Sequence, residues 1–97
     1  MSDRSIKNFI DFLKQSPKNK ILLYVYADWC DKCNLDKTKI KNIPFYLINV
    51  DKSDDLIDIL DIRIVPYFML ISYDYKNNDI IVHETFDNVQ DVYNFQF

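Results

Sequence analysis

The chain has 97 residues, a net charge of −3 and a pI near 4.9, and 48% of its residues are hydrophobic. This length and hydrophobic content support one packed core, so we expect residues 1–97 to form a single domain. The small negative charge gives no reason to expect nucleic acid or an anionic membrane as a partner.

The N-terminal stretch MSDRSIKNFIDFLKQSPKNK has no uninterrupted apolar region and no small-residue cleavage site. No segment approaches the roughly 18 apolar residues of a membrane span. We therefore expect a cytoplasmic protein without a signal peptide or a transmembrane segment.

The first two predicted elements are an amphipathic helix and a buried strand. The helix begins near Ser5 and ends at Ser16 and Pro17, and its apolar residues recur at intervals of three and four: Ile6, Phe9, Ile10 and Leu13. The run ILLYVYA at 21–27 is almost entirely apolar or aromatic. Such a run is typical of a strand that is covered on both faces.

Two more helices and a strand are predicted in the middle of the chain. The stretch NLDKTKIKN is rich in helix formers, so we expect a short helix from Cys30 or nearby that stops at Pro44. A second strand follows at 45–51. Residues 52–62 then form a helix with Ser53 as a possible N-cap, and the side chains expected to face inward are Leu56, Ile57, Ile59 and Leu60.

The C-terminal part predicts a hairpin and a last helix. The predicted hairpin has strands at 67–75 and 79–86 and a turn at Asn77 and Asn78. In the last helix, one apolar face is formed by Val89, Val92, Tyr93 and Phe97. The chain has no glycine, so Asn and Asp are the best occupants of positive φ. The order of elements predicts a mixed sheet with helices on both faces.

Both cysteines and the only tryptophan lie in the stretch YADWCDKC at 26–33. Two cysteines this close cannot form a disulfide framework, which favours local thiol chemistry. At a helix start, unpaired N–H groups stabilise a thiolate and lower its pKa from about 8.5 to about 3.5–7.5. Cys30 is then the candidate nucleophile, and Cys33 resolves the mixed disulfide.

Two other interpretations of the cysteine pair remain open. The two thiols could be ordinary small buried side chains. A zinc site needs about four ligands, and beyond the two thiols only His83 is a soft candidate. We therefore assign no metal to this chain and no role to His83.

Three stretches resemble the thioredoxin family. YADWCDKC after an apolar strand is similar to its Trp-Cys-x-x-Cys active site, NVD at 49–51 to a strand ending, and DIRIVPYFMLI at 61–71 to the segment that leads into a cis-proline. The resemblance implies the thioredoxin-like α/β fold without the family's leading strand. It has a central mixed β-sheet of about four strands flanked by helices on both faces.

The resemblance also implies a small thiol–disulfide oxidoreductase, that is, an enzyme acting on protein disulfides. Cys30 would attack a substrate disulfide and Cys33 would release the substrate, while Trp29 flanks the reactive sulfur. Pro66 would be the cis-proline, and the Val65 backbone would pair with an extended substrate segment. We expect a monomer that needs no cofactor beyond the Cys30–Cys33 disulfide. Its partners would be protein disulfides or dithiols and a reductase or oxidase that exchanges electrons with it.

The sequence departs from the family's pattern at several positions. Tyr24 stands where the family has a buried acid, and Leu47 aligns with the lysine beside that acid. Asp31 and Lys32 replace the familiar Gly-Pro between the cysteines. Asp31 disfavours the Cys30 thiolate and Lys32 favours it, so both would modulate the pKa of that thiol.

Other departures leave room for different functions. The glycines that shape the family's substrate groove are absent, and Phe86 stands near one of those places. A redox-inactive adaptor that binds a partner through the same fold is therefore an alternative. A glutaredoxin-like activity ranks lower, because only Asp87 and Asn88 stand where the glutathione site usually has a glycine-containing turn.

Overall fold

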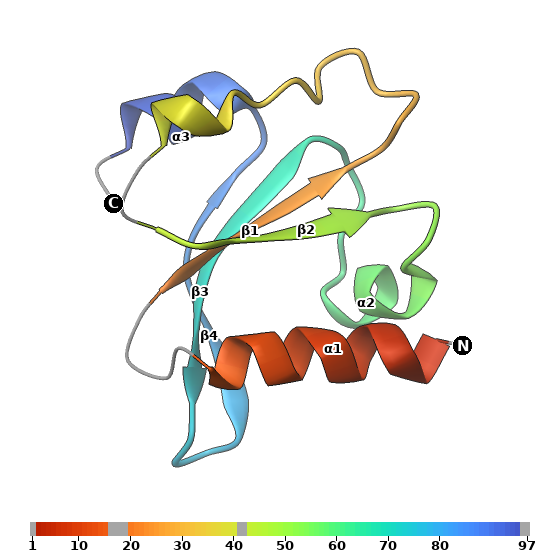
Figure 1. The fold of residues 1–97 in the computed structure, drawn as a ribbon, viewed down its shortest axis with the longest axis vertical. Coiled ribbons are helices and arrows are strands. Elements are labelled where there is room, and N and C mark those ends of the chain that lie inside the picture. The colour runs from red at the N-terminus through yellow and green to blue at the C-terminus, as the bar shows by residue number, and fades with distance from the viewer. Residues whose placement is uncertain (1, 16–19, 41–42, 96–97) are drawn as a thin grey trace.

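The computed structural model describes residues 2–15, 20–40 and 43–95. Four strands form one sheet in the order β2-β1-β3-β4, namely β1 (Ile21–Tyr26), β2 (Phe45–Asn49), β3 (Tyr67–Asp74) and β4 (Asp79–Phe86). β1 pairs parallel with β2 and antiparallel with β3, and β3 pairs antiparallel with β4. The sheet is therefore mixed, as expected (Figure 1).

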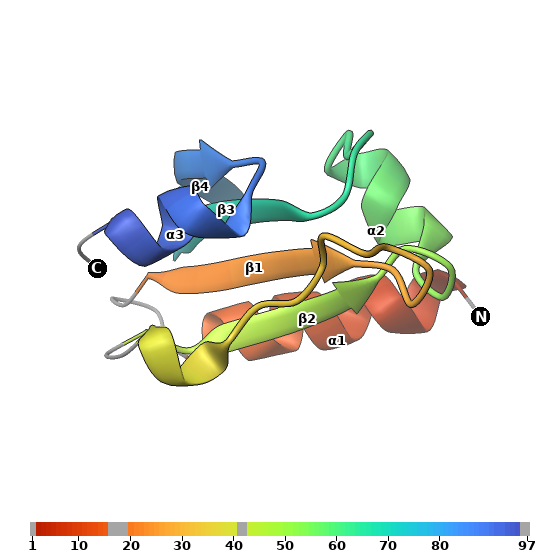
Figure 2. The ribbon, with the colours of Figure 1, turned by 90° about the horizontal axis from the view of Figure 1, so that it is seen from above.

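Helices cover both faces of this sheet (Figure 2). On one face lie α1 (Ser2–Lys14) and α2 (Asp54–Ile59). On the other lie α3 (Val89–Asn94) and the long connection from β1 to β2, which holds one 3₁₀ turn at Lys37–Lys39. Among the described residues, no helix is long and apolar enough to cross a membrane.

The position of β1 inside the sheet, between β2 and β3, explains why its sequence is apolar without interruption. Leu23 and Val25 point into the core beneath α1 and α2, and both are fully buried. Leu22 and Tyr24 point into a second core on the α3 side, together with Phe68 of β3. Because successive side chains of a strand alternate between faces, a strand covered on both sides needs apolar residues at every position.

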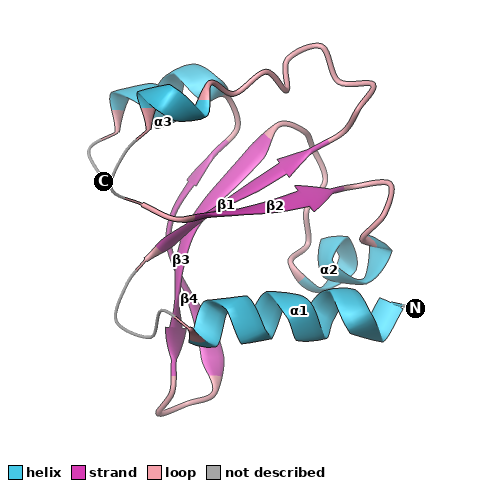
Figure 3. Cartoon of the chain, viewed as in Figure 1, coloured by secondary structure: helices cyan, strands magenta, loops and turns pink. Residues whose placement is uncertain are grey.

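The helix predicted from Cys30 to Pro44 is wrong. Between Cys30 and Pro44, the described residues 30–40 and 43–44 form turns and loop, apart from the 3₁₀ turn at Lys37–Lys39 (Figure 3). The side chain of Asp36 accepts hydrogen bonds from the Thr38 N–H at 3.0 Å and the Thr38 Oγ1 at 2.6 Å. Aspartate and threonine compete for backbone groups in this way and so favour turns over a continuous helix.

Smaller differences concern helix ends and one side chain. α1 begins at Ser2, earlier than the predicted start at Ser5. Its predicted end at Ser16 and Pro17 lies outside the described residues. Phe97, which was predicted on the apolar face of the last helix, lies outside them as well. Ser53 is the N-cap of α2 but makes no side-chain capping bond. The prediction for Ile59 is wrong, because this side chain is 61% exposed rather than turned inward.

The hairpin follows the expected pattern. β4 has the predicted bounds, and the turn residue Asn78 adopts a positive φ of 52°. Asp61, in the loop that precedes β3, adopts the other positive φ of the described part, at 54°. These values confirm that Asn and Asp occupy positive φ in a chain without glycine. His83 of β4 lies against Ser72 of β3, with Nε2 2.8 Å from Oγ.

Candidate active site

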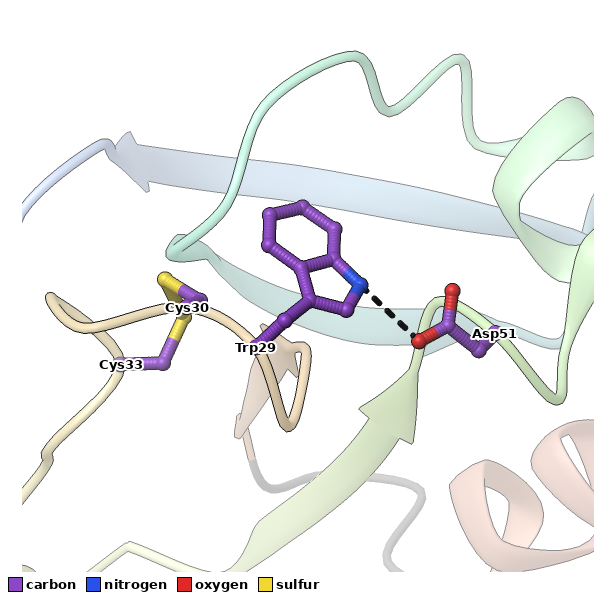
Figure 4. The surroundings of a disulfide bond; sticks show 4 residues. All are labelled: Trp29, Cys30, Cys33 and Asp51. Atoms are coloured by element: carbon purple, nitrogen blue, oxygen red, sulfur yellow. Dashed lines mark hydrogen bonds between the residues drawn. A yellow bond between two sulfur atoms is a disulfide. The ribbon is translucent and has the colours of Figure 1, made fainter.

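The two cysteines form a disulfide just beyond the C-terminal end of β1 (Figure 4). Their Cα atoms are 5.3 Å apart, and both residues are half-buried. Two consecutive turns shape this segment, since the Cys30 N–H donates to the Ala27 carbonyl and the Cys33 N–H donates to the Cys30 carbonyl, each at 3.2 Å. The Cys-x-x-Cys spacing thus closes a small redox-capable ring without a helix.

The absence of a helix at Cys30 corrects one part of the sequence argument. We expected a helix N-terminus to place Cys30 outward, to tuck Cys33 behind it and to lower the pKa of the Cys30 thiol. The structure has turns in that place, and both cysteines are partly buried. The helix dipole is therefore not a source of thiolate stabilisation here.

Trp29 is 67% exposed and lies beside the disulfide. Its Nε1 donates a hydrogen bond to Oδ2 of Asp51 at 3.0 Å, as Figure 4 shows. Asp51 follows β2, and its backbone N–H donates to the side chain of Asn49 at 3.0 Å. The loop after β2 thus holds the indole in place. The sequence indicated that a strand ends at 49–51, but it did not predict that Asp51 contacts Trp29.

Pro66 is buried directly before β3, and the Val65–Pro66 peptide bond is cis. Val65 and Trp29 share an apolar groove of about 420 Å³, whose other residues are Val50, Ile57, Ile62, Arg63 and Ile64. Ile64 is 52% exposed, so an apolar surface faces outward beside the indole. The only charged side chain of this groove, Arg63, is bonded to Asp61.

A second, more polar groove of about 310 Å³ brings Pro66 together with Asp31 and Lys32. Its remaining residues come from the loop after Cys33 and from the turn before and into α3: Asn34, Asp87, Asn88, Val89 and Gln90. The seven residues singled out in the sequence therefore lie in the disulfide or line one of these two grooves. Val65 and Trp29 line one groove, Asp31, Lys32 and Pro66 line the other, and Cys30 and Cys33 form the disulfide.

Tyr24 occupies the interior of the α3 side, beneath the loop that carries the cysteines. It is 6% exposed, and its ring stacks on Phe68 with centroids 4.9 Å apart and planes 4° apart. Burial raises the pKa of its hydroxyl above the ordinary value of 10.0, and a hydrogen bond with the Leu35 backbone opposes this rise. Tyr24 therefore stays a neutral phenol at neutral pH and cannot accept a proton as a carboxylate would.

Two further departures take a definite form in the structure. Leu47, which aligns with the family's lysine, is 42% exposed on β2. Phe86, which stands near a groove glycine of the family, is buried and packs against Phe95 with ring centroids 5.2 Å apart. The Phe86 side chain therefore fills the core rather than the polar groove.

Comparison with known proteins agrees with this geometry. The family model "Thioredoxin" matches residues 2–93. Thioredoxin-1 of Caenorhabditis elegans is 33% identical over 81 residues, which span 76% of this chain and 67% of that protein. The range matched by the family model includes the strand, cysteine and proline segments.

Solved structures show the same fold at lower identity. Trichomonas vaginalis thioredoxin superposes with a TM-score of 0.68 at 17% identity, covering 89% of this chain and 81% of that one. Thioredoxin f2, solved in complex with ferredoxin:thioredoxin reductase, gives a TM-score of 0.66 at 19% identity, covering 88% and 81%. The chain therefore belongs to the thioredoxin family of thiol–disulfide oxidoreductases.

Proposed function

We propose that this protein exchanges its Cys30–Cys33 dithiol with disulfides of protein substrates. The observation that carries the proposal is a Cys30–Cys33 disulfide whose sequence neighbours line two grooves, Trp29 the one that holds Val65, and Asp31 and Lys32 the one that holds the cis-proline Pro66. Thiol–disulfide exchange requires a thiolate that reaches a substrate sulfur and a second thiol close enough to finish the reaction. Both cysteines of this pair are half-buried at the surface and meet that requirement.

The reaction has two steps. The Cys30 thiolate attacks one sulfur of the substrate disulfide, forms a mixed disulfide, and the other substrate sulfur leaves as a thiolate that takes up a proton. The Cys33 thiol then loses its proton and attacks Cys30, and the first substrate sulfur leaves in the same way. The substrate gains two electrons and two protons, and the protein ends with the Cys30–Cys33 disulfide.

Substrate binding is assigned to the groove of Trp29 and Val65. An extended segment of the substrate would place apolar side chains against the exposed faces of Trp29 and Ile64. Beside it, the backbone of Val65 would pair with the main chain of that segment, because an extended segment offers its N–H and C=O groups on one edge. Asp31 and Lys32 flank the sulfurs on the other side and would set the charge near the Cys30 thiolate.

The electron partner is a reductase that reduces the Cys30–Cys33 disulfide, or an oxidase that oxidises the Cys30–Cys33 dithiol. A solved relative of the same fold was crystallised with ferredoxin:thioredoxin reductase, which supports a protein partner of this general kind. We propose further that the protein acts as a cytoplasmic monomer and that the disulfide carries the electrons without another cofactor. The redox-inactive adaptor is not favoured, because both cysteines of the family's site are present and bonded.

Substitution of each cysteine tests this function. We expect the wild type to reduce a protein disulfide in the presence of a dithiol donor, and Cys30→Ser to be inactive. Cys33→Ser should instead accumulate a mixed disulfide with the substrate, visible as a mass adduct that a reductant removes. Equal inactivity of the wild type and Cys30→Ser would contradict the enzyme assignment.

A further inference from the structure

The loop that follows Cys33 has to be held without the help of a helix. Residues 34–36 lie between the disulfide and the 3₁₀ turn, and they make no helical ladder. Asp36 is exposed to solvent, so its backbone N–H could bond to water, and a protein partner for it fixes the path of the loop more than it satisfies a buried group. Two tyrosines from distant parts of the chain supply the contacts.

The first is Tyr93 of α3, which lies 57 positions beyond the residue it contacts. Its hydroxyl accepts a hydrogen bond of 2.8 Å from the N–H of Asp36. The tyrosine ring is fixed in turn, since Lys39 Nζ lies 5.0 Å from its centroid and the neighbouring Val92 is fully buried. Tyr93 therefore ties the loop to the last helix.

The second is Tyr24 of β1, which belongs to the buried cluster against which Leu35 and Tyr93 both pack. Its ring lies flat against Phe68, two positions after the cis-proline, and its hydroxyl interacts with the Leu35 backbone. The two tyrosines thus act on adjacent residues of the loop. We call the contacts of Tyr24 and Tyr93 with residues 35 and 36 the tyrosine anchor.

We propose that Tyr24 and Tyr93 are positioning residues for Cys33, which they keep within reach of Cys30 whenever the disulfide is open. The inference rests on the proposed function and deepens it. In the oxidised protein the disulfide itself fixes the path of the chain at Cys33. In the mixed disulfide and in the dithiol that covalent tie is absent, and the tyrosine anchor, attached two and three positions further on, defines where Cys33 lies.

Loss of the tyrosine anchor should affect only the second step of the reaction, in which Cys33 attacks the mixed disulfide at Cys30. Cys33 attacks Cys30 within the same chain, so its rate and equilibrium depend on the effective concentration of one sulfur near the other. A looser loop lowers that concentration. The first step, attack of Cys30 on a substrate, does not require Cys33 and should be unchanged.

The test compares Tyr24→Phe, Tyr93→Phe and the double variant, which remove the hydroxyls and keep the rings. Tyr46→Phe is the matched control, because Tyr46 packs against Phe9 and Phe12 on the opposite face of the sheet. The first readout is the equilibrium constant of the Cys30–Cys33 disulfide against a glutathione redox buffer. The second is the pre-steady-state rate at which a preformed mixed disulfide on Cys30 is resolved.

Loss of each hydroxyl should lower both quantities by about 3- to 10-fold, the range for one hydrogen bond, and Tyr46→Phe should leave them unchanged. The attack rate of Cys30, measured in a Cys33→Ser background, should be the same with and without the tyrosine substitutions. Unchanged equilibrium and resolution in a folded double variant would overturn the inference, even if thermal stability falls. The glutathione equilibrium needs no protein substrate, so it reports on the tyrosine anchor even if the proposed function fails.

Discussion

The indole Nε1 of Trp29 donates a hydrogen bond of 3.0 Å to Oδ2 of Asp51, which joins the residue before Cys30 to the loop after β2. Asp51→Ala should release the ring. Because the bond is exposed to water, we expect the free energy of unfolding to fall by less than about 1 kcal/mol. The ring, however, should move more freely.

Time-resolved fluorescence anisotropy measures that motion directly, since Trp29 is the only tryptophan. The expected result is a larger fast-decaying component in Asp51→Ala than in the wild type. Asp58→Ala, an exposed change on α2, is the control and should leave the decay unaltered. An identical decay in Asp51→Ala would show that the hydrogen bond does not restrain the indole.

Substitution of a leucine in β1 should destabilise the protein much more than substitution of a leucine in β2. Leu23 is fully buried in β1, whereas Leu47 is 42% exposed in β2. Leu23→Ala should destabilise the protein by about 2–5 kcal/mol, because it removes buried methyl groups and leaves a cavity. Leu47→Ala should cost less than about 1 kcal/mol. Urea unfolding of both variants checks this, and equal losses would contradict the burial assigned to β1.

The N-caps of the two short helices differ in the same testable way. Asn88 Oδ1 accepts the N–H of Asp91 at 2.9 Å and caps α3, whereas Ser53 makes no side-chain capping bond to α2. Asn88→Ala should therefore lower stability by about 0.5–2 kcal/mol. Ser53→Ala should be close to neutral in the same thermal unfolding experiment. A loss at Ser53 as large as that at Asn88 would argue against this difference.

Alkaline pH should weaken the fold through its buried tyrosines. Burial raises the pKa of Tyr24 and of Tyr46 above 10.0 in the folded protein. Below pH 10 both groups are neutral in either state and stability is unaffected. Above it the unfolded chain loses these protons first, so stability falls as the pH rises toward the folded pKa values.

The measurement is the free energy of unfolding in urea from pH 8 to the alkaline limit of the folded state. Tyr46→Phe and Tyr24→Phe should each flatten the decline above about pH 10, where the free tyrosine titrates. Tyr75→Phe serves as the control, because Tyr75 is 47% exposed. A decline of the same steepness in all three variants would exclude the buried phenols as its source.

The sequence predicted the sheet well where one physical signal dominated. An unbroken apolar run of strand length is typical of a strand covered on both sides, and β1 is such a strand. The hairpin turn at Asn78 and the cysteine and proline segments likewise lie where their patterns indicated. The extent of the domain and the individual roles of the site residues stay predictions until they are measured.

The connection from Cys30 to Pro44 shows what the sequence could not predict. Its lysines and leucine favour a helix by propensity, but Asp36 adopts an extended backbone and caps only the short 3₁₀ turn at Lys37–Lys39, so helical structure begins after it rather than at Cys30. The partners of this loop lie on β1 and α3, and no local pattern marks Tyr24 or Tyr93 as contacts of residues so distant in the chain. Ile59 of α2 is exposed because it lies at the margin of the helix face that Leu56 buries, on the side away from Ile57 and Leu60.

The lack of glycine has a consequence for the unfolded chain. Asp61 and Asn78 adopt positive φ, at an intrinsic cost of roughly 1–2 kcal/mol each that only tertiary contacts can offset. Against this, every position carries a Cβ, and replacing a glycine by alanine at a compatible site typically adds about 0.4–1 kcal/mol of stability by narrowing the unfolded ensemble. A measurable share of this protein's stability therefore originates in the conformations that its denatured state cannot reach, rather than in any contact of the folded one.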